Sequence, residues 1–392
     1  MPGRILVLNL GSTSYKFKLF DFSSGEAPLA SGHVERIGEA QSSWSFEKDG
    51  AARQSGSCAC ACHEDAFDFC SSLLTGRGTL DSMELLDGIA FKAVHGGPTR
   101  GAKLVDGKLL EIIESFSPFA PAHNPVYARL MRRLLEKRPG LKQVACFETS
   151  FHSDIPLCRA IYGVPYEWIE RYGIRRYGFH GASHSCIAGM MRELSPKARK
   201  VISLHLGGSS SICAISDGRS IASSMGATPQ SGLFQNNRVG DFDAFCIPRL
   251  AEAKGGQLPD VMRDLATKSG FLGISGVSND LREVVWASEE GNARAKLAID
   301  AFIDNCVGCI GMFTAYLQGL DALAFTGGIG QNCALIRNGI CERLAYMGVR
   351  LDAAKSEGLL SAPDSRVQVW ALETNEELVV ARQAAALLAE SK

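Results

Sequence analysis

The feature of this sequence that most constrains its fold is an internal repeat. Residues 5–21 read ILVLNLGSTSYKFKLFD, residues 201–217 read VISLHLGGSSSICAISD, and the two segments align without gaps. Each segment has an apolar stretch, a turn rich in Gly and Ser, and a second stretch with strand character. The repeat therefore predicts two related domains, each beginning with the same β-hairpin.

The turn chemistry of the repeated hairpin points to anion binding. Gly and Ser at a tight turn let backbone N–H groups approach an anion closely, and the hydroxyls add donors. In the first hairpin the candidate phosphate contacts are Ser12, Ser14 and Lys16. Alternation along residues 15–19 also puts Lys16 on the polar face of any half-exposed strand, so this pattern alone leaves its role open.

A third glycine-rich element lies near the C-terminus. Residues 321–332, DALAFTGGIGQN, predict an apolar strand followed by glycines, and residues 333–348 predict a helix. The N-terminus of that helix would face whatever lies over the turn. A nicotinamide dinucleotide is excluded, because no acidic residue stands about 20 residues further on in a βαβ unit.

Composition fits a soluble globular chain of two comparable domains. The chain has 392 residues, of which 46% are hydrophobic and 21% charged, which excludes a disordered or fibrous protein. The formal net charge of −1 gives no bulk attraction for a nucleic acid or an acidic membrane. Any anion must therefore be bound by a local site.

No targeting or membrane segment is expected. The apolar stretch at the N-terminus is short and is broken by Asn9 and Gly11, unlike a signal peptide. No segment has about 18 uninterrupted apolar residues, so we expect no transmembrane helix and take the cytoplasm as the default. The odd number of cysteines, 13, predicts reduced and mostly buried thiols.

One cysteine cluster stands out, at Cys58, Cys60, Cys62 and Cys70, with His63 beside it. Residues two apart on a strand point the same way, so three thiols would line one face. The C-x-C-x-C spacing lacks the paired C-x₂-C knuckles of a structural zinc site. It favours a strand or loop before a helix that starts near Glu64, and it leaves metal binding open.

Ten ordered blocks give the chain a resemblance to the acetate kinase family, within the actin-like ATPase superfamily. They are NLGSTSYKFKLF (9–20), VERIG (34–38), AVHGG (93–97), APAHNP (120–125), YGIRRYGFHGASH (172–184), HLGG (205–208), SMGATPQSGL (224–233), SGFLGISGVSNDLRE (269–283), GGIGQN (327–332) and TNEELVVAR (374–382). The resemblance runs from residue 4 to about residue 385. It implies an α/β fold of two duplicated actin-like ATPase (RNase H-like) domains with an interdomain active-site cleft. The expected domains are residues 1–148 plus 376–392 and residues 149–375.

The resemblance also implies roles for individual residues. The implied catalytic residues are Glu148, His180, Arg238 and His123. The implied carboxylate-binding residues are Lys92, Val94, Ala122, Phe179 and Pro229. The implied nucleotide-binding residues, besides the three of the first hairpin, are His205, Leu206, Gly207, Gly208, Ser209, Asp280, Leu281, Arg282, Gly328, Ile329, Gly330, Gln331 and Asn332. The implied Mg²⁺ ligands are Asn9 and Glu376, with Glu377 as the neighbouring alternative, although Asn9 also suits a plain strand-end turn.

Several of these positions depart from the family pattern. Lys92 stands where the family usually has Arg, and Glu148 where it has Asp; together they still suit a cation–carboxylate pair. A Lys in place of an Arg cannot form the two parallel hydrogen bonds with which a guanidinium binds a substrate carboxylate. Ala122 replaces a Leu and predicts a roomier acyl pocket. Gly208 replaces an Asn, and Gln331 a Glu, near the nucleotide phosphates.

The implied reaction is direct, reversible in-line transfer of a phosphoryl group between ATP and a short carboxylic acid, with acetate as the leading substrate. Such a reaction needs cations and donors around the transferring group more than a strong base. Two alternatives stay open: a kinase for a larger acid such as propionate or butyrate, and a nucleotide-binding sensor that has lost turnover. The resemblance further implies a homodimer.

Overall fold

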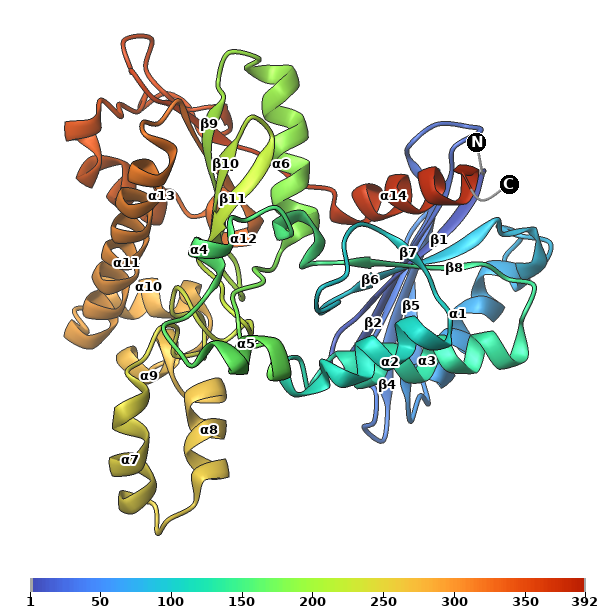
Figure 1. Cartoon of the computed structure of the whole chain (residues 1–392). Helices are drawn as coiled ribbons and strands as arrows, with labels where there is room; N and C mark the ends of the chain where they lie inside the picture. The colour runs from blue at the N-terminus through green and yellow to red at the C-terminus, as the bar shows by residue number, and fades with distance from the viewer. Residues whose placement is uncertain (1–2, 391–392) are drawn as a thin grey trace. The chain divides into compact units, whose positions relative to one another are not determined.

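The computed structural model describes residues 3–390. The chain divides into two compact units, Met1–Ser153 with Asn375–Lys392 (unit 1) and Asp154–Thr374 (unit 2). Each unit contains one mixed sheet with helices on both faces (Figure 1). The predicted α/β class is therefore confirmed.

Unit 1 is built on an eight-stranded sheet with the order β5-β4-β3-β2-β1-β6-β8-β7. Its strands are β1 (Arg4–Leu10), β2 (Ser14–Asp21), β3 (Pro28–Glu35), β4 (Ser42–Lys48), β5 (Gln54–Cys58), β6 (Gly88–Ala93), β7 (Lys103–Leu104) and β8 (Gln143–Phe147). Its helices are α1 (His63–Gly76), α2 (Gly107–Ser115), α3 (Asn124–Lys137) and α14 (Glu376–Glu390), with short 3₁₀ turns at Met83–Leu85, Ser117–Phe119 and Ser150–His152.

Alternation in β2 sets the faces of this sheet. Tyr15, Phe17 and Leu19 are buried in the main core of the unit, while Lys16 is exposed. The helices α1, α2 and α3 cover that face, and α14 packs on the other one (Figure 1). Helix α14 approaches β6 closely at Gly88, where a Cβ would lie 2.7 Å from Leu388 Cδ1 and would displace that side chain.

Unit 2 is built on a six-stranded sheet with the order β11-β10-β9-β12-β14-β13. Its strands are β9 (Lys200–His205), β10 (Ser211–Ser216), β11 (Arg219–Ser223), β12 (Ala322–Thr326), β13 (Gly358–Leu359) and β14 (Gln368–Ala371). Its helices are α4 (Leu157–Ala160), α5 (Tyr166–Tyr172), α6 (Gly181–Leu194), α7 (Ile247–Ala253), α8 (Leu258–Thr267), α9 (Gly270–Ser275), α10 (Leu281–Glu289), α11 (Ala293–Leu317), α12 (Gly327–Asn332) and α13 (Ala334–Arg343), with 3₁₀ turns at Ala244–Cys246 and Ala345–Met347.

The two sheets share one topology, as the sequence repeat predicts. In unit 1 the order β3-β2-β1-β6-β8 has β1 antiparallel to β2 and parallel to β6. In unit 2 the order β11-β10-β9-β12-β14 has β9 antiparallel to β10 and parallel to β12. The repeated hairpins are thus β1–β2 and β9–β10, and the duplication is confirmed in the structure.

Helix α11 is the central helix of unit 2. It is long and apolar enough to cross a membrane by length and composition, with a mean hydropathy of 1.4 over its best window. Nine of its residues, from Ala295 to Leu317, are buried in the core of the unit. Its polar side carries charges such as Asp300, which lies 2.6 Å from Lys296. These features are those of a core helix.

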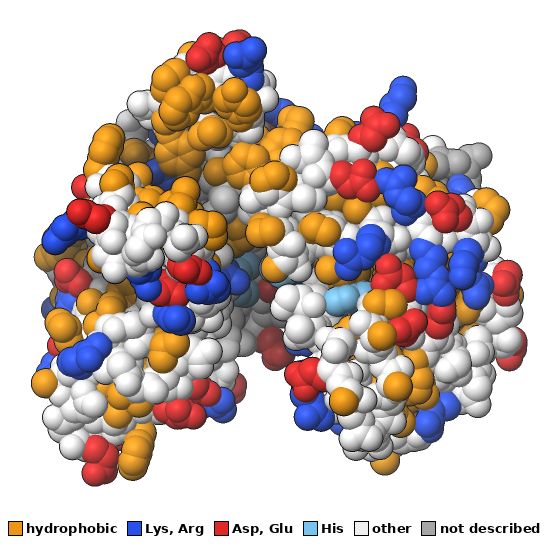
Figure 2. All heavy atoms as spheres, turned by 90° about the horizontal axis from the view of Figure 1, so that it is seen from below, with side chains coloured by type: hydrophobic (Ala, Val, Ile, Leu, Met, Phe, Trp, Pro, Cys, Tyr) orange, Lys and Arg blue, Asp and Glu red, His pale blue; other side chains and the backbone are white. Residues whose placement is uncertain are grey.

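Surface charge agrees with the balanced composition. On the face shown in Figure 2, acidic and basic side chains are interspersed, and neither sign forms a continuous field. All 13 cysteines are free, six of them buried and five half-buried, as the sequence predicts for reduced thiols. Among residues 3–390 no group of three or more His, Cys, Asp or Glu side chains is arranged to hold a metal ion.

Candidate active site

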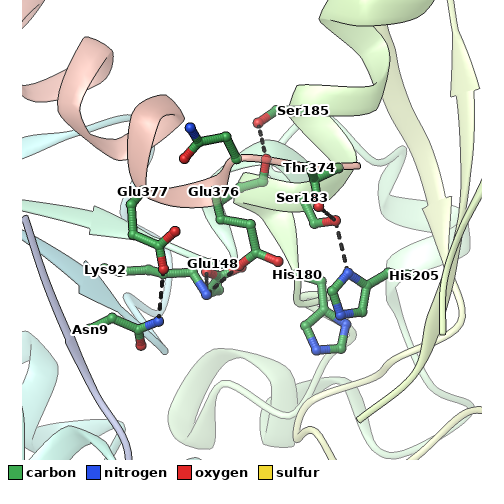
Figure 3. Close-up of polar contacts among 12 residues, drawn as sticks. Asn9, Lys92, Glu148, His180, Ser183, Ser185, His205, Thr374, Glu376 and Glu377 are labelled. Carbon is green, nitrogen blue, oxygen red and sulfur yellow. Dashed lines mark hydrogen bonds and ion pairs between the residues drawn. The ribbon is translucent and has the colours of Figure 1, made fainter. Parts of the chain in front are cut away.

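A half-buried lysine lies among carboxylates in unit 1. Lys92, on β6, places its ammonium 3.1 Å from Glu148 Oε1 and also contacts Glu376 Oε2 (Figure 3). Burial alone would lower the pKa of Lys92, but the Glu148 and Glu376 carboxylates outweigh it and hold that pKa well above its usual value. The ammonium therefore stays charged and neutralises part of an acidic cluster. The expected Lys92–Glu148 pair is present.

Glu377 and Asn9 form the adjoining part of this cluster. The amide of Asn9, near the end of β1, donates to Glu377 Oε1 at 3.4 Å, and Lys18 lies 3.3 Å from Glu377 Oε2. Burial would raise the pKa of Glu377, but Lys18 and Lys92 outweigh it and lower that pKa. Hard oxygen atoms from Asn9, Glu376 and Glu377 thus gather at the start of α14 (Figure 3).

The turn of the first hairpin is held by three hydrogen bonds. Gly11 N donates to Ser14 O at 2.8 Å, Ile37 N donates to Thr13 O at 3.0 Å, and the His63 Nε2 atom is 2.8 Å from Gly11 O. Burial lowers the pKa of His63, although its hydrogen bond to the Gly11 backbone opposes that shift. Ser12 is exposed and Ser14 is half-buried, so both hydroxyls are accessible to a ligand.

In unit 2 two histidine rings lie face to face. His180 and His205 have ring centroids 4.2 Å apart and an interplanar angle of 24° (Figure 3). His180 precedes α6 in the left-handed region, with φ of 56°, a conformation uncommon for a residue with a side chain. Such strain at a non-glycine residue is typical of functional positions.

Hydroxyl groups orient both rings. The Ser211 Oγ atom lies 2.8 Å from His180 Nδ1 and 2.8 Å from Nε2 of the buried His184. Ser183 Oγ lies 2.8 Å from His205 Nδ1. Ser183 and Ser211 were not among the residues predicted from the sequence. Their role depends on β10 and α6 being adjacent, and no spacing along the chain encodes that adjacency.

Arg238 is held by neutral acceptors. Its Nη1 atom donates to Ser209 Oγ at 3.1 Å, to Gln235 Oε1 at 3.2 Å and to the backbone oxygen of Pro229 at 3.3 Å. Burial lowers the pKa of the guanidinium, which nevertheless stays charged at neutral pH because its ordinary pKa exceeds about 12. A charged fork among neutral acceptors suits an added anion.

A cavity of about 880 Å³ in unit 2 brings together eight of the predicted nucleotide residues. These are Gly207, Gly208, Asp280, Leu281, Arg282, Gly328, Ile329 and Asn332. The cavity is completed by Asn236, Asn279, Val285 and Cys333, which the sequence analysis did not single out. Of the remaining predicted nucleotide residues, Leu206 supports the glycine element: its carbonyl accepts from Ile329 N at 2.8 Å and from Gly330 N at 3.0 Å.

Glycine is required where this element begins. Gly327 has φ of +75°, and a Cβ there would lie 2.6 Å from the Leu206 carbonyl oxygen. The GGIGQN segment is itself the short helix α12, where the sequence predicted a turn, and α13 follows it. Buried Arg337 donates to the Gly330 carbonyl at 3.0 Å and ties the two helices together.

The remaining predicted residues are placed in both units. In unit 1 His123 precedes α3 and is half-buried, Ala122 is exposed and Val94 is half-buried. In unit 2 Phe179 is buried and Pro229 is half-buried. Asp280 caps α10 by accepting from Arg282 N at 2.9 Å, which is the ordinary helix-start role that such a pair also has.

Comparisons with known proteins show the family of this chain. The sequence model of the Acetokinase family matches residues 4–382. The chain belongs to this family. It is 40% identical to an acetate kinase of Dictyoglomus turgidum over 99% of this chain and 98% of that protein. It is 38% identical to a propionate kinase of Citrobacter rodentium over 97% and 96%.

Solved structures of family members have the same fold. A Porphyromonas gingivalis acetate kinase matches with a TM-score of 0.89 at 33% identity, covering 98% of this chain and all of that one. A Francisella tularensis propionate kinase matches with a TM-score of 0.90 at 33% identity, covering 97% and 98%. The chain is therefore a phosphotransferase with a carboxyl group as acceptor, built from two duplicated actin-like domains.

Proposed function

We propose that this protein transfers the γ-phosphoryl group of ATP to a short carboxylic acid, with acetate as the leading substrate, in a direct and reversible reaction. The observation that carries the proposal is the cavity in unit 2, where segments 207–208, 279–282 and 328–332 meet. These segments are far apart in sequence and match the family blocks for nucleotide binding. Family membership along nearly the whole chain supports the carboxyl acceptor.

In this proposal the nucleotide base and sugar lie against Asp280, Leu281 and Arg282, and the glycines of α12 and of the 207–208 turn approach the phosphates. A Cβ at Gly328 would stand in open space, and a Cβ at Gly207 would make ordinary van der Waals contact with the Ser209 carbonyl oxygen at 3.4 Å. Backbone N–H groups at such positions are able to come close to phosphate oxygens. Ser12, Ser14 and Lys16 supply further donors to phosphate from the first hairpin.

His180 and Arg238 act on the transferring phosphoryl group. The transition state spreads negative charge over the equatorial oxygens, so it is stabilised by oriented donors. Ser211 orients the ring of His180, which is proposed to donate to the phosphoryl oxygens, and Arg238 offers its guanidinium. His123 is the second histidine of the proposal, and Lys92 with Glu148 orients the carboxylate acceptor.

Mg²⁺ is proposed to bind beside Asn9. Magnesium takes oxygen ligands, keeps several waters and is commonly held by one or two protein groups plus substrate phosphates. The amide and carboxylate oxygens of Asn9, Glu376 and Glu377 fit that donor set. When bound, the ion neutralises phosphate charge and orients the phosphoryl group. Glu376 is the proposed carboxylate ligand. To bind Mg²⁺ it would have to give up its ion pair with Lys92, whereas Glu377 already accepts a hydrogen bond from Asn9.

Acyl size is proposed to be set by Val94, Ala122, Phe179 and Pro229. The small side chain of Ala122 favours a pocket that also accepts propionate. The relatives include both acetate and propionate kinases at nearly equal identity, so they support both acids. One methylene changes binding in an apolar pocket by only about 1–3 kcal/mol, so we expect both acids to react.

We further propose that the protein is a cytoplasmic homodimer, as the family resemblance implies. Light scattering on the purified protein tests this: a mass near twice 42.1 kDa supports a dimer, and a mass near 42.1 kDa contradicts it.

The direct test traps acyl phosphate with hydroxylamine after incubation of the protein with ATP, Mg²⁺ and a panel of acids. Hydroxamate from acetate, lost in the Arg238→Ala variant, supports the proposal. Product from butyrate but not acetate favours a kinase for a larger acid. No product from any acid, with ATP still bound, favours a nucleotide-binding sensor.

A further inference from the structure

The cysteine segment that follows β5 lies against the turn of the first hairpin. Cys58 is the last residue of β5 and pairs with Ser42, and its Sγ atom lies 3.6 Å from Cys60 Sγ. The two side chains point the same way because one extended residue, Ala59, separates them. The two sulfur atoms are already in contact, and a covalent bond between them requires an approach to about 2.05 Å.

The two thiols differ in access. Cys58 is half-buried, so a small reagent can reach it, whereas Cys60 is 1% exposed. Burial, followed by the contact with Cys58, raises the pKa of Cys60 to about 12. Cys58 is therefore the sulfur that reacts first, and Cys60 is positioned to attack it afterwards.

Two chains of hydrogen bonds lead from this segment to the hairpin turn. Along the first, Gly38 N donates to the Cys60 carbonyl at 3.0 Å, and its neighbour Ile37 donates to Thr13 O. Along the second, His63 begins α1 directly after Cys62 and contacts the Gly11 carbonyl. Both contacts that hold the turn from outside the hairpin thus come from residues next to the cysteine segment.

We propose that Cys58 and Cys60 form a reversible disulfide with a low-molecular-weight disulfide as oxidant, and that the bond displaces the Gly11–Thr13 turn. The Cys58 thiolate attacks one sulfur of the reagent and releases its other half as a thiolate. Cys60 loses its proton and attacks Cys58 Sγ, which releases the second half. Two protein thiols are oxidised, the reagent is reduced to two thiols, and these take up the two protons.

The bond pulls Cys60 toward Cys58 and changes the path of residues 58–62. The carbonyl of Cys60 and the start of α1 then move, and with them the hydrogen bonds to Thr13 and Gly11. A ring closed over a single intervening residue is strained, and strained disulfides are those that thiols reduce readily. Reduction therefore restores the turn.

The experiment equilibrates the full chain with mixtures of reduced and oxidised glutathione, blocks free thiols with iodoacetamide and digests with trypsin. Residues 54–77 form one tryptic peptide that contains Cys58, Cys60, Cys62 and Cys70. We expect this peptide to escape alkylation at two cysteines and to lack fragment ions from cleavage within 58–60. The Cys58→Ser variant should abolish the link, and the matched Cys62→Ser variant in the same peptide should retain it.

A link between other cysteines, or glutathione attached to Cys58 without a link, overturns the disulfide. Displacement of the turn is read by amide hydrogen exchange, which should become faster in the peptide covering residues 10–15 of the oxidised protein. Unchanged exchange there, with the link formed, overturns the displacement.

The kinase readout rests on the proposed function, whereas the peptide and exchange readouts do not. Oxidation should lower acyl phosphate formation by about tenfold or more, because a misplacement of about 1 Å can cost about 10²-fold in rate. Dithiothreitol should restore it, and Cys58→Ser should match the parent when reduced and resist oxidation. A protein that makes no acyl phosphate even when reduced refutes the proposed function alone.

Discussion

Replacing Lys92 by methionine removes an ammonium that contacts both Glu148 and Glu376. Methionine keeps the unbranched shape, so the packing of the aliphatic part changes little. The buried Glu148 carboxylate and the half-buried Glu376 carboxylate then lose their ion pairs with Lys92. Breaking a buried ion pair by removing one partner typically costs about 3–5 kcal/mol, because the remaining charge is uncompensated. For a unit of this size that corresponds to a fall in Tm of roughly 6–20 °C.

The pH dependence of this loss has a definite sign. In the parent, the raised pKa of Lys92 stabilises the fold at all pH values below its unfolded pKa of about 10.4, and the lowered pKa of Glu377 stabilises it above about pH 4.3. In Lys92→Met the carboxylates bind protons more readily in the folded state. The difference in the free energy of unfolding between the parent and Lys92→Met should therefore become smaller as the pH falls from about 8 to about 5.

Scanning calorimetry across that pH range measures both effects and separates transitions of the two units. Lys18→Met is the matched control, because Lys18 is a third exposed and contacts only the outer carboxylate, Glu377, at 3.3 Å. The Lys18→Met substitution should lower the free energy of unfolding by no more than about 1 kcal/mol. The double variant Lys92→Met/Glu148→Gln should recover part of the loss. A Lys92→Met protein that melts like Lys18→Met at every pH would refute the idea that the ammonium compensates buried charge.

Four further outcomes follow from the placement of individual residues. His180→Ala should lower kcat by about 10²–10³-fold with little change in KM for ATP, measured by steady-state kinetics; an unchanged kcat contradicts the donor role. Ser211→Ala should lower kcat by up to about 10²-fold through a misoriented ring, with little change in KM for ATP, measured by steady-state kinetics. Glu376→Ala should raise the Mg²⁺ concentration needed for activity more than Glu377→Ala does, and the reverse order would identify Glu377 as the ligand. Ala122→Leu should lower kcat/KM for propionate relative to acetate, and an unmoved ratio would show that this residue does not face the acyl chain.

The fold was predictable because its information lies in local sequence. The hairpin repeat at residues 5–21 and 201–217 encodes a strand, a turn and a second strand in each unit. The five central strands of unit 1 and the corresponding strands of unit 2 then have the same order. The cation–carboxylate pair of Lys92 and Glu148 was also predictable, since their complementary changes from the family pattern pointed to a retained contact.

The details of the histidine site were not predictable. Ser211 bridges His180 and His184, and Ser183 orients His205, through side chains that meet only when β10, β9 and α6 pack together. Serine near a glycine turn is common, so its type and position carry no signal for this role. Asn236 and Asn279 reach the cavity of unit 2 for the same reason, from loops whose path is set by tertiary packing.

The placement of charge in unit 1 links stability to the proposed chemistry. A site that receives ATP and a carboxylate must tolerate added negative charge, yet Glu148, Glu376 and Glu377 already lie around one lysine. The ammonium of Lys92 pairs with Glu148 and Glu376, and Lys18 pairs with Glu377 at the outer edge of the cluster. A bound cation beside Asn9 would take over part of this compensation and free Lys92 for the acceptor carboxylate. Mg²⁺ should therefore raise the Tm of Lys92→Met more than that of the parent, because the variant has the larger uncompensated charge.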